Sequence, residues 1–311
     1  MQMNRDKIYS VGTIRRIPCP HCSHLCSIKT DRCVKCGEPL PDLHKSGEAP
    51  STVQGLSEPE FNEGTYIRLL VEMIEKEIPQ RSEMSPDKRG YIEEQGHIVG
   101  ISLPYCKLIS LPPLIADLKH LRILFLSQNF LKTIPKQLIH MPSLEILRLD
   151  HNKIEEIPSF IAKLNNLESL ILDANALTQI PKWIGELPSL KTLSIKRNSL
   201  KSIPNTLISL EKLEYLNLRI NELETIPSSL GYFKNLLELN LSSNNLKEIP
   251  ESIGNLKSLK RLNLSNNKLI KLPETLSNIP SLERLNIKAN FWLNTPTLIE
   301  ILEQKGVKVL K

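Results

Sequence analysis

Residues 121–143 read LRILFLSQNFLKTIPKQLIHMPS, and this stretch determines how the rest of the chain is interpreted. Leu124 and Leu126 alternate with residues of other kinds, which is the period of a β-strand with one buried face. Asn129 follows at the point where the strand ends, and Pro135 lies in the segment that returns from it. The stretch therefore predicts a short strand, a turn and a return segment.

The same pattern returns every 23 residues, as the asparagines show. A strict period of this size is typical of a solenoid, in which each unit buries its apolar face only by stacking on its neighbours. We predict an α/β fold of nine units over residues 98–295: a right-handed solenoid with a parallel, concave sheet. The periodic position holds Cys106, Asn129, Asn152, Asn175, Asn198, Asn221, Asn244, Asn267 and Asn290.

We interpret the periodic asparagines as structural. A buried amide offers donors and an acceptor to the backbone at the end of each strand, where unpaired peptide groups would be costly. Cys106 occupies the same position and is predicted to be a small buried thiol rather than a nucleophile.

Both ends of the solenoid need a cap, because a ribbon of leucine cannot face water. We assign residues 64–97 to the first cap and 296–311 to the second. The first is predicted to hold a helix at 65–77 and two strands joined at Gln95-Gly96. The second is predicted to hold a helix at 296–304 ended by Gly306, then an edge strand at Val307–Leu310.

Five of the six cysteines lie between Cys19 and Cys36, in the pattern CPHC, ten residues, CVKC. Two such Cys-x-x-Cys pairs let four thiolates meet around one tetrahedral zinc ion, which would fold a segment too small to fold alone. The predicted ligands of this structural Zn²⁺ are Cys19, Cys22, Cys33 and Cys36. His21, His24 and Cys26 are alternative ligands, and a redox Cys-x-x-Cys is the alternative chemistry.

These cysteines define a small zinc ribbon over residues 18–41. Residues 1–17 are polar and are predicted to be loose. Residues 42–63 are rich in Pro, Gly, Ser and Glu, the composition of a flexible linker.

Units such as NNLKEIPESIGNLKSLKRLNLS (residues 244–265) resemble the cytoplasmic 23-residue leucine-rich repeats of the Ras-suppressor and Ras-group intracellular proteins, and those of similar prokaryotic proteins. The resemblance covers residues 98–290. It implies a solenoid that recognises proteins, in some members small GTPases or phosphatases. The cysteine-rich segment resembles the short zinc ribbons of many prokaryotic proteins, but it has Ser23 where the first Cys pair usually carries glycine.

The outward-facing strand residues predict a binding surface with two lobes. Its early units are apolar, and its later units are basic. Residues 98–311 hold 27 Lys and Arg against 19 Asp and Glu, although the whole chain carries a net charge of only +6. The candidate partner-binding residues are Ile123, Phe125, Ile146, Arg148, Ile171, Lys196, Arg197, Arg219, Arg261, Arg284 and Lys288.

We therefore expect a non-enzymatic, monomeric scaffold that binds a partner protein on its concave face. No stretch has the length and apolarity of a membrane span, and the start lacks the apolar core of a signal peptide, so a cytoplasmic location is expected. The alternative is a nucleic-acid-associated regulator acting through the zinc ribbon, but that segment has no aromatic residue for base stacking. A repeat-containing enzyme such as a ubiquitin ligase would need a further domain.

Overall fold

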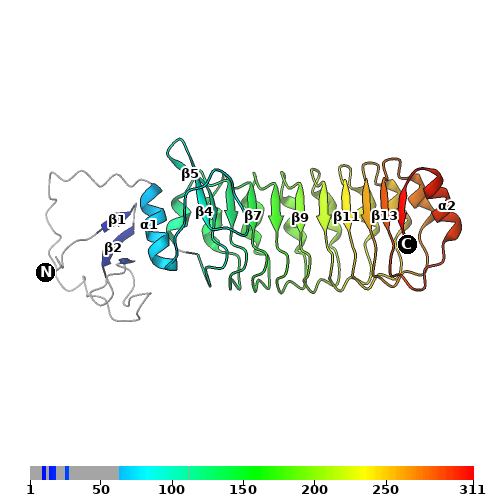
Figure 1. Ribbon diagram of the computed structural model, residues 1–311, viewed down its shortest axis with the longest axis horizontal. Coiled ribbons are helices and arrows are strands. Elements are labelled where there is room, and N and C mark those ends of the chain that lie inside the picture. The colour runs from blue at the N-terminus through cyan, green and yellow to red at the C-terminus, as the bar shows by residue number, and fades with distance from the viewer. Residues whose placement is uncertain (1–8, 12–13, 19–24, 28–62, 112) are drawn as a thin grey trace. The chain divides into compact units, whose positions relative to one another are not determined.

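The computed structural model describes residues 9–11, 14–18, 25–27, 63–111 and 113–311 (Figure 1). The chain divides into two units, Met1–Asn62 and Glu63–Lys311, and each is described by itself. The four predicted zinc ligands lie outside the described residues, as do His21, His24 and the predicted linker as far as residue 62.

The described part of the first unit is an antiparallel sheet of three short strands: β1 (Tyr9–Val11), β2 (Ile14–Pro18) and β3 (Leu25–Ser27). Cys26 lies in β3, opposite Ile17. The prediction that residues before 18 are loose is wrong for β1 and most of β2. Their β-branched residues favour an extended chain that pairs with a neighbouring strand.

The second unit is built on one sheet of eleven strands, in the order β14 to β4. All neighbouring strands are parallel except β4 and β5, which form an antiparallel hairpin. The repeated strands begin 23 residues apart. They are β6 (Ile123–Phe125), β7 (Ile146–Arg148), β8 (Ser169–Ile171), β9 (Thr192–Ser194), β10 (Tyr215–Asn217), β11 (Glu238–Asn240), β12 (Arg261–Asn263) and β13 (Arg284–Asn286).

A continuous ribbon of leucine forms the core of this unit. The register places Leu124 beside Leu147, Leu147 beside Leu170, and so on along the sheet. Each of these leucines is at most 1% exposed. Burying one leucine side chain contributes about 1.5–3 kcal/mol, so a stack of such units is stabilised through every pair of neighbours.

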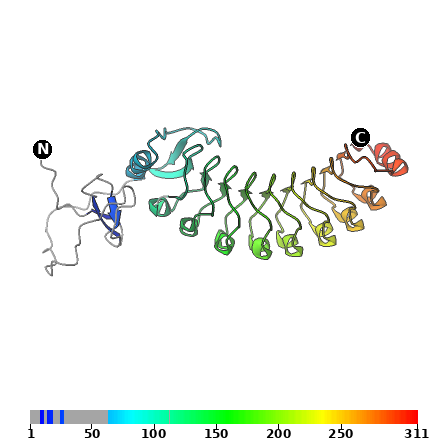
Figure 2. The ribbon, with the colours of Figure 1, turned by 90° about the horizontal axis from the view of Figure 1, so that it is seen from below.

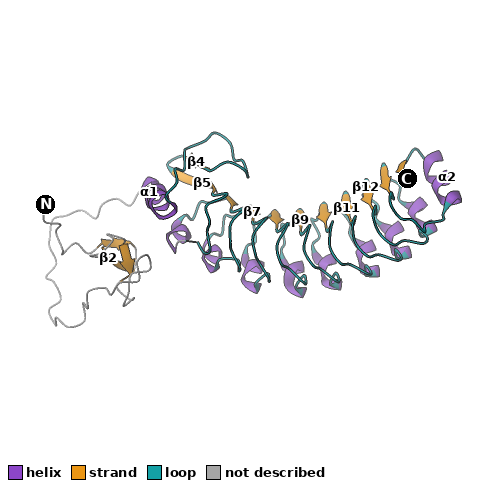
Figure 3. Cartoon of the chain, turned by 60° about the horizontal axis from the view of Figure 1, so that its bottom comes forward, coloured by secondary structure: helices purple, strands orange, loops and turns teal. Residues whose placement is uncertain are grey.

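Short 3₁₀-helices return the chain on the opposite side from the strands (Figures 2 and 3). The periodic proline precedes each one, from η2 to η8, with φ between −63° and −75°. Its carbonyl accepts the first i to i+3 hydrogen bond, as Pro135 does from Leu138 (3.2 Å). Because a helical turn is wider than a strand, the stack curves with the strands on its concave face. The 3₁₀-helices are η1 (Pro113–Asp117), η2 (Lys136–His140), η3 (Ser159–Lys163), η4 (Lys182–Glu186), η5 (Asn205–Ser209), η6 (Ser228–Tyr232), η7 (Glu251–Asn255) and η8 (Glu274–Asn278).

The periodic asparagines pair with backbone groups, as their position predicted. Asn129 Oδ1 accepts hydrogen bonds from the backbone N–H groups of Cys106 and Leu108, both at 3.0 Å. Its Nδ2 donates to the carbonyls of Leu103 and Leu126 at 2.8 and 3.0 Å. The residue before each asparagine has a left-handed backbone, with φ between 52° and 59°. This turn brings the amide under the end of the strand, where it satisfies otherwise unpaired peptide groups.

The first cap consists of helix α1 (Glu63–Ile74) and the hairpin of β4 (Gly90–Glu94) and β5 (His97–Ser102). The helix was predicted at 65–77. It begins earlier because the Glu63 carboxylate accepts the Ile98 N–H, which ties the helix start to β5. It ends earlier because Glu75 takes a left-handed conformation, with φ of 52°. The predicted turn at Gln95-Gly96 is confirmed, since both residues have positive φ.

The second cap consists of helix α2 (Pro296–Gln304) and strand β14 (Lys308–Leu310), close to their predicted bounds. Gly306, with φ of 85°, ends the helix. Its N–H donates to the Glu303 carbonyl and the Val307 N–H donates to the Leu302 carbonyl, at 2.9 and 3.0 Å. This pattern is the Schellman motif, which needs a left-handed residue and therefore favours glycine. β14 then pairs in parallel with β13 and closes the sheet.

Cys106 is buried, and burial raises the pKa of its thiol although Lys76 and Arg89 lie near enough to lower it in part. A raised pKa leaves less thiolate at neutral pH, so we expect slow reaction of native protein with a thiol reagent at this residue. Labelling should accelerate as pH rises and become fast on unfolding. Mass spectrometry of the Cys106 peptide measures the rate, and fast labelling of folded protein at neutral pH would contradict the assignment.

Candidate protein-binding surface

The register of the sheet arranges the outward-facing side chains of the concave surface in three columns. Each column takes one residue from each of the repeats that carry β6 to β13, because adjacent strands pair at a constant offset, and the first column continues into β14. The first column is Ile123, Ile146, Ser169, Thr192, Tyr215, Glu238, Arg261, Arg284 and Lys308. The second is Phe125, Arg148, Ile171, Ser194, Asn217, Asn240, Asn263 and Asn286. The third is Ser127, Asp150, Asp173, Lys196, Arg219, Ser242, Ser265 and Lys288.

The predicted apolar lobe exists, but its aromatic residue does not face solvent. Phe125 is only 7% exposed, so its assignment as an exposed anchor is wrong. The Arg148 guanidinium lies over its ring, with Cζ 5.8 Å from the ring centre. On the other side, Phe125 pairs with Ser102, whose hydroxyl donates to the Ser85 carbonyl at 2.9 Å. The first cap thus reaches over the start of the concave face, as Figure 3 shows for the loop before β4.

Three isoleucines remain accessible in this lobe: Ile123, Ile146 and Ile171 are each half-buried. They lie on three adjacent strands: Ile123 pairs with Ile146, and Ile171 lies diagonally from Ile146, beside Arg148. Partly exposed aliphatic residues in such a cluster can anchor a partner when the contact excludes water.

Two aspartates of the third column, which the sequence analysis did not single out, lie beside the apolar lobe and precede Lys196 in that column. Asp150 accepts hydrogen bonds from Ser127 Oγ at 2.8 Å and from Arg148 Nε at 3.2 Å. Asp173 accepts from Ser194 Oγ at 2.6 Å and from the Lys196 N–H at 2.8 Å. Burial raises the pKa of the Asp173 carboxyl despite these bonds.

The basic lobe contains the predicted cations, in differing environments. Arg197, Arg219, Arg284 and Lys288 are exposed, and none of them forms an ion pair with another described residue. Lys196 is half-buried. Arg261 pairs with Glu238 on the neighbouring strand, which neutralises its charge. The free positive charge therefore comes from the third column, from the last strands of the first column and from Arg197, which lies in the turn after Lys196.

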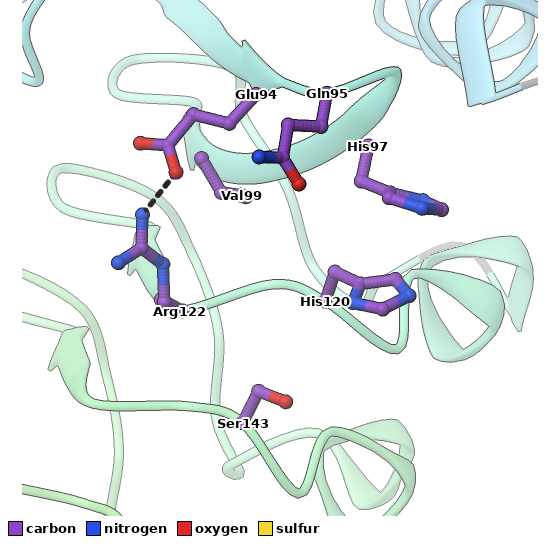
Figure 4. Close-up of a pocket in the computed structure, with 7 residues that line it drawn as sticks. All are labelled: Glu94, Gln95, His97, Val99, His120, Arg122 and Ser143. Carbon is purple, nitrogen blue, oxygen red and sulfur yellow. Dashed lines mark hydrogen bonds and ion pairs between the residues drawn. The ribbon is translucent and has the colours of Figure 1, made fainter.

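A shallow pocket lies beside the first cap, on residues that the sequence did not indicate (Figure 4). The ring centres of His97 and His120 are 3.9 Å apart, with the ring planes tilted by 31°. Arg122 Nη2 lies 2.7 Å from Glu94 Oε2. His97 Nδ1 also lies 3.1 Å from Glu63 Oε1. Among the residues that the structure describes, no group of three or more His, Cys, Asp or Glu is placed to hold a metal. We interpret the pocket as the junction between cap and repeats.

Comparison with known proteins agrees with this architecture. A family profile described as a leucine-rich repeat region matches residues 109–220, and a second, described as a leucine rich repeat, matches residues 216–269 and 234–290. This chain is a leucine-rich repeat protein. No curated protein matches it.

Among solved structures, a leucine-rich repeat protein of Leptospira interrogans superposes with a TM-score of 0.63 and 35% sequence identity, over 66% of this chain and 52% of that one. This chain thus spans about half the length of the Leptospira protein. The plant peptide hormone receptor RGFR1, in complex with RGF2, gives a TM-score of 0.52 and 32% identity over 58% and 30% of the two chains. An internalin from Listeria monocytogenes gives 0.60 and 21% over 68% and 60%, which shows the fold alone.

The leucine-rich repeat fold commonly mediates protein–protein interaction, and the strand register places most of the predicted residues in the three columns of one sheet face. In the described segments of this protein, no helix combines the length and apolarity needed to cross a bilayer. Two further features of the concave face lay outside the sequence analysis. One is Tyr215, 36% exposed in the first column. The other is the run of asparagines at the end of the second column, which the repeated Leu-Asn-Leu or Leu-Asn-Ile triplets could have indicated.

Proposed function

We propose that this leucine-rich repeat protein is a non-enzymatic scaffold that binds a partner protein on its concave face. The observation that carries the proposal is the division of that face into an apolar lobe and a basic lobe on one uninterrupted sheet. An apolar lobe supplies affinity through desolvation, and unpaired cations speed the encounter with an acidic partner. The resemblance to the Ras-suppressor repeats makes small GTPases in the cytoplasm the first class of partner to test.

The test compares variants on the two faces in affinity capture from host lysate, followed by kinetics with the captured partner. Ile146→Glu with Ile171→Glu should raise the dissociation rate of the partner. The binding free energy should become less favourable by about 2 kcal/mol or more. Arg219→Glu with Arg284→Glu should lower the association rate and reduce its salt dependence. Arg284 is preferred to Arg261 here because Glu238 already neutralises Arg261.

The matched control reverses the charge of two exposed lysines on the convex side, through Lys182→Glu with Lys257→Glu. This change alters net charge as much as the arginine pair does but leaves the concave face intact. If the control abolishes binding and both concave pairs do not, the binding surface is convex. Capture that is lost on RNase treatment would favour the nucleic-acid alternative.

We further propose that the cysteine-rich segment binds one structural zinc ion through Cys19, Cys22, Cys33 and Cys36, and that it acts as a second, tethered contact module. The support is the spacing of the two Cys-x-x-Cys pairs, whose thiolates suit a closed tetrahedral site.

Elemental analysis of reduced protein should give about one zinc per chain, the stoichiometry of a single four-thiolate site. Cys33→Ser with Cys36→Ser should abolish this binding, because two ligands cannot hold the ion tightly. Cys26→Ser is the matched control and should retain zinc. Retention by the double variant, or loss in the control, would require a different ligand set.

A further inference from the structure

The second column of the concave face ends in a row of four asparagines, defined here as the amide row: Asn217, Asn240, Asn263 and Asn286. They lie on four adjacent strands and pair directly in register. Each is flanked by buried residues, as Asn217 is by Leu216 and Leu218, so its side chain faces away from the core. The row is separate from the buried periodic asparagines, which lie at the ends of the strands.

The structure fixes the orientation of every amide in this row. In each case Oδ1 accepts a hydrogen bond from the backbone N–H two residues further on, at 3.1 Å in Asn217, Asn240 and Asn263 and at 3.2 Å in Asn286. The serine hydroxyls of Ser242 and Ser265 donate to the same oxygens, at 2.7 and 2.8 Å. Because a backbone N–H can only donate, the atom facing it must be the oxygen.

The Nδ2 group of each amide is therefore the atom left for a ligand. None of the four Nδ2 groups donates a hydrogen bond to any residue that the structure describes. Pre-oriented donors lose little entropy on binding, so they favour a ligand rich in acceptors. Adjacent strands are about 4.8 Å apart, so the row spans roughly 14 Å, the length of about four extended residues.

Cations flank the amide row on both sides. Arg284 and Lys308 belong to the first column, and Arg219 and Lys288 belong to the third. All four are exposed and form no ion pair within the described part of the chain. A ligand lying along the row would thus place its main chain over neutral donors and its side chains near positive charge.

We propose that the amide row binds an extended, acidic peptide segment, with peptide carbonyls on the asparagine Nδ2 groups and carboxylates on the flanking cations. This proposal rests on the proposed function and specifies the chemistry of the partner. A peptide suits the row better than a nucleic acid does, because neutral amide donors match peptide carbonyls. Within the three columns, the four strands that carry the row hold one aromatic residue, Tyr215, for stacking bases.

The experiment measures fluorescence anisotropy of labelled probes with the full chain. The probes are a peptide of alternating Glu and Val, the same peptide with Gln or Lys in place of Glu, and an oligodeoxythymidylate of equal length. We expect the Glu peptide to bind most tightly, the Gln peptide more weakly and the Lys peptide least. Tighter binding of the oligodeoxythymidylate than of the Glu peptide, or no binding of any peptide, would overturn the proposal.

Variants then separate hydrogen bonding from charge. Asn240→Ala with Asn263→Ala leaves the net charge unchanged. It should weaken binding of the Glu peptide about tenfold, because two hydrogen bonds to the peptide are lost. Asn240→Asp with Asn263→Asp keeps the oxygens that accept the backbone bonds but replaces the Nδ2 donors with negative charge. This change should weaken binding of the Glu peptide further. The control, Asn166→Ala with Asn235→Ala, removes exposed amides elsewhere, each with one bond to a carbonyl.

Thermal unfolding of each variant verifies that it is folded. Folded alanine and aspartate variants that both bind the Glu peptide as the unchanged protein does would overturn the amide row as a site. The proposed function would still stand in that case if the glutamate substitutions at Ile146 with Ile171 and at Arg219 with Arg284 weaken binding of the captured partner. The two failures are therefore distinguishable.

Discussion

Asn129→Ala is expected to lower the free energy of unfolding by about 2–6 kcal/mol, because two buried N–H groups lose their acceptor at about 1–3 kcal/mol each. Asn129 is the most buried of the periodic asparagines, at 3% exposed. Its Oδ1 is the acceptor for both Cys106 and Leu108, so the replacement leaves these peptide groups without a partner beneath the first repeat. Urea unfolding followed by circular dichroism measures the change.

The control is Asn166→Ala, which removes an exposed amide with a single bond to the Pro142 carbonyl, at 2.9 Å. We expect a change within about 0.5 kcal/mol there, as for most surface substitutions. Equal effects at the two positions would show that burial of the amide is not what makes the periodic asparagine structural.

Gly231→Val is expected to destabilise the solenoid by about 1–3 kcal/mol or more through overpacking. Gly231 lies in η6, where an added Cβ would overlap the carbonyl oxygen of Ser252 in the next unit. The backbone carbonyl cannot move without displacing η7, so neighbouring units would have to separate. Calorimetry should show a lower melting temperature for this variant.

The matched control for this change is Ala162→Val, at the equivalent position of η3, where the chain already carries a Cβ. A change below about 1 kcal/mol is expected, because Ala162 is partly exposed and an added methyl group can face solvent. If the two substitutions cost the same, close contact between η6 and η7 does not limit side-chain size at this position.

The candidate site could be predicted only in part. The register of the strands follows from the period, so the columns that hold Ile146, Arg219 and Arg284 were accessible to sequence reasoning. The burial of Phe125 was not, because it depends on which side chain the neighbouring strand presents, here Arg148, and on the cap residue Ser85 that bonds Ser102 on the other side. The ion pair that neutralises Arg261 likewise depends on which residue the neighbouring strand presents beside it.

The sequence by itself determined the repeated strands, the buried leucines, the bonding position of the asparagines and most bounds of the second cap. Each of these depends on contacts within one unit or between units a fixed 23 residues apart, and a periodic sequence repeats such contacts without variation. Only the tertiary structure decided how far the first cap covers the concave face, where η6 and η7 touch at Gly231, and which way the amides of Asn217 to Asn286 point. Those features depend on atoms brought together by the three-dimensional stacking of particular side chains, which hydrophobic periodicity does not encode.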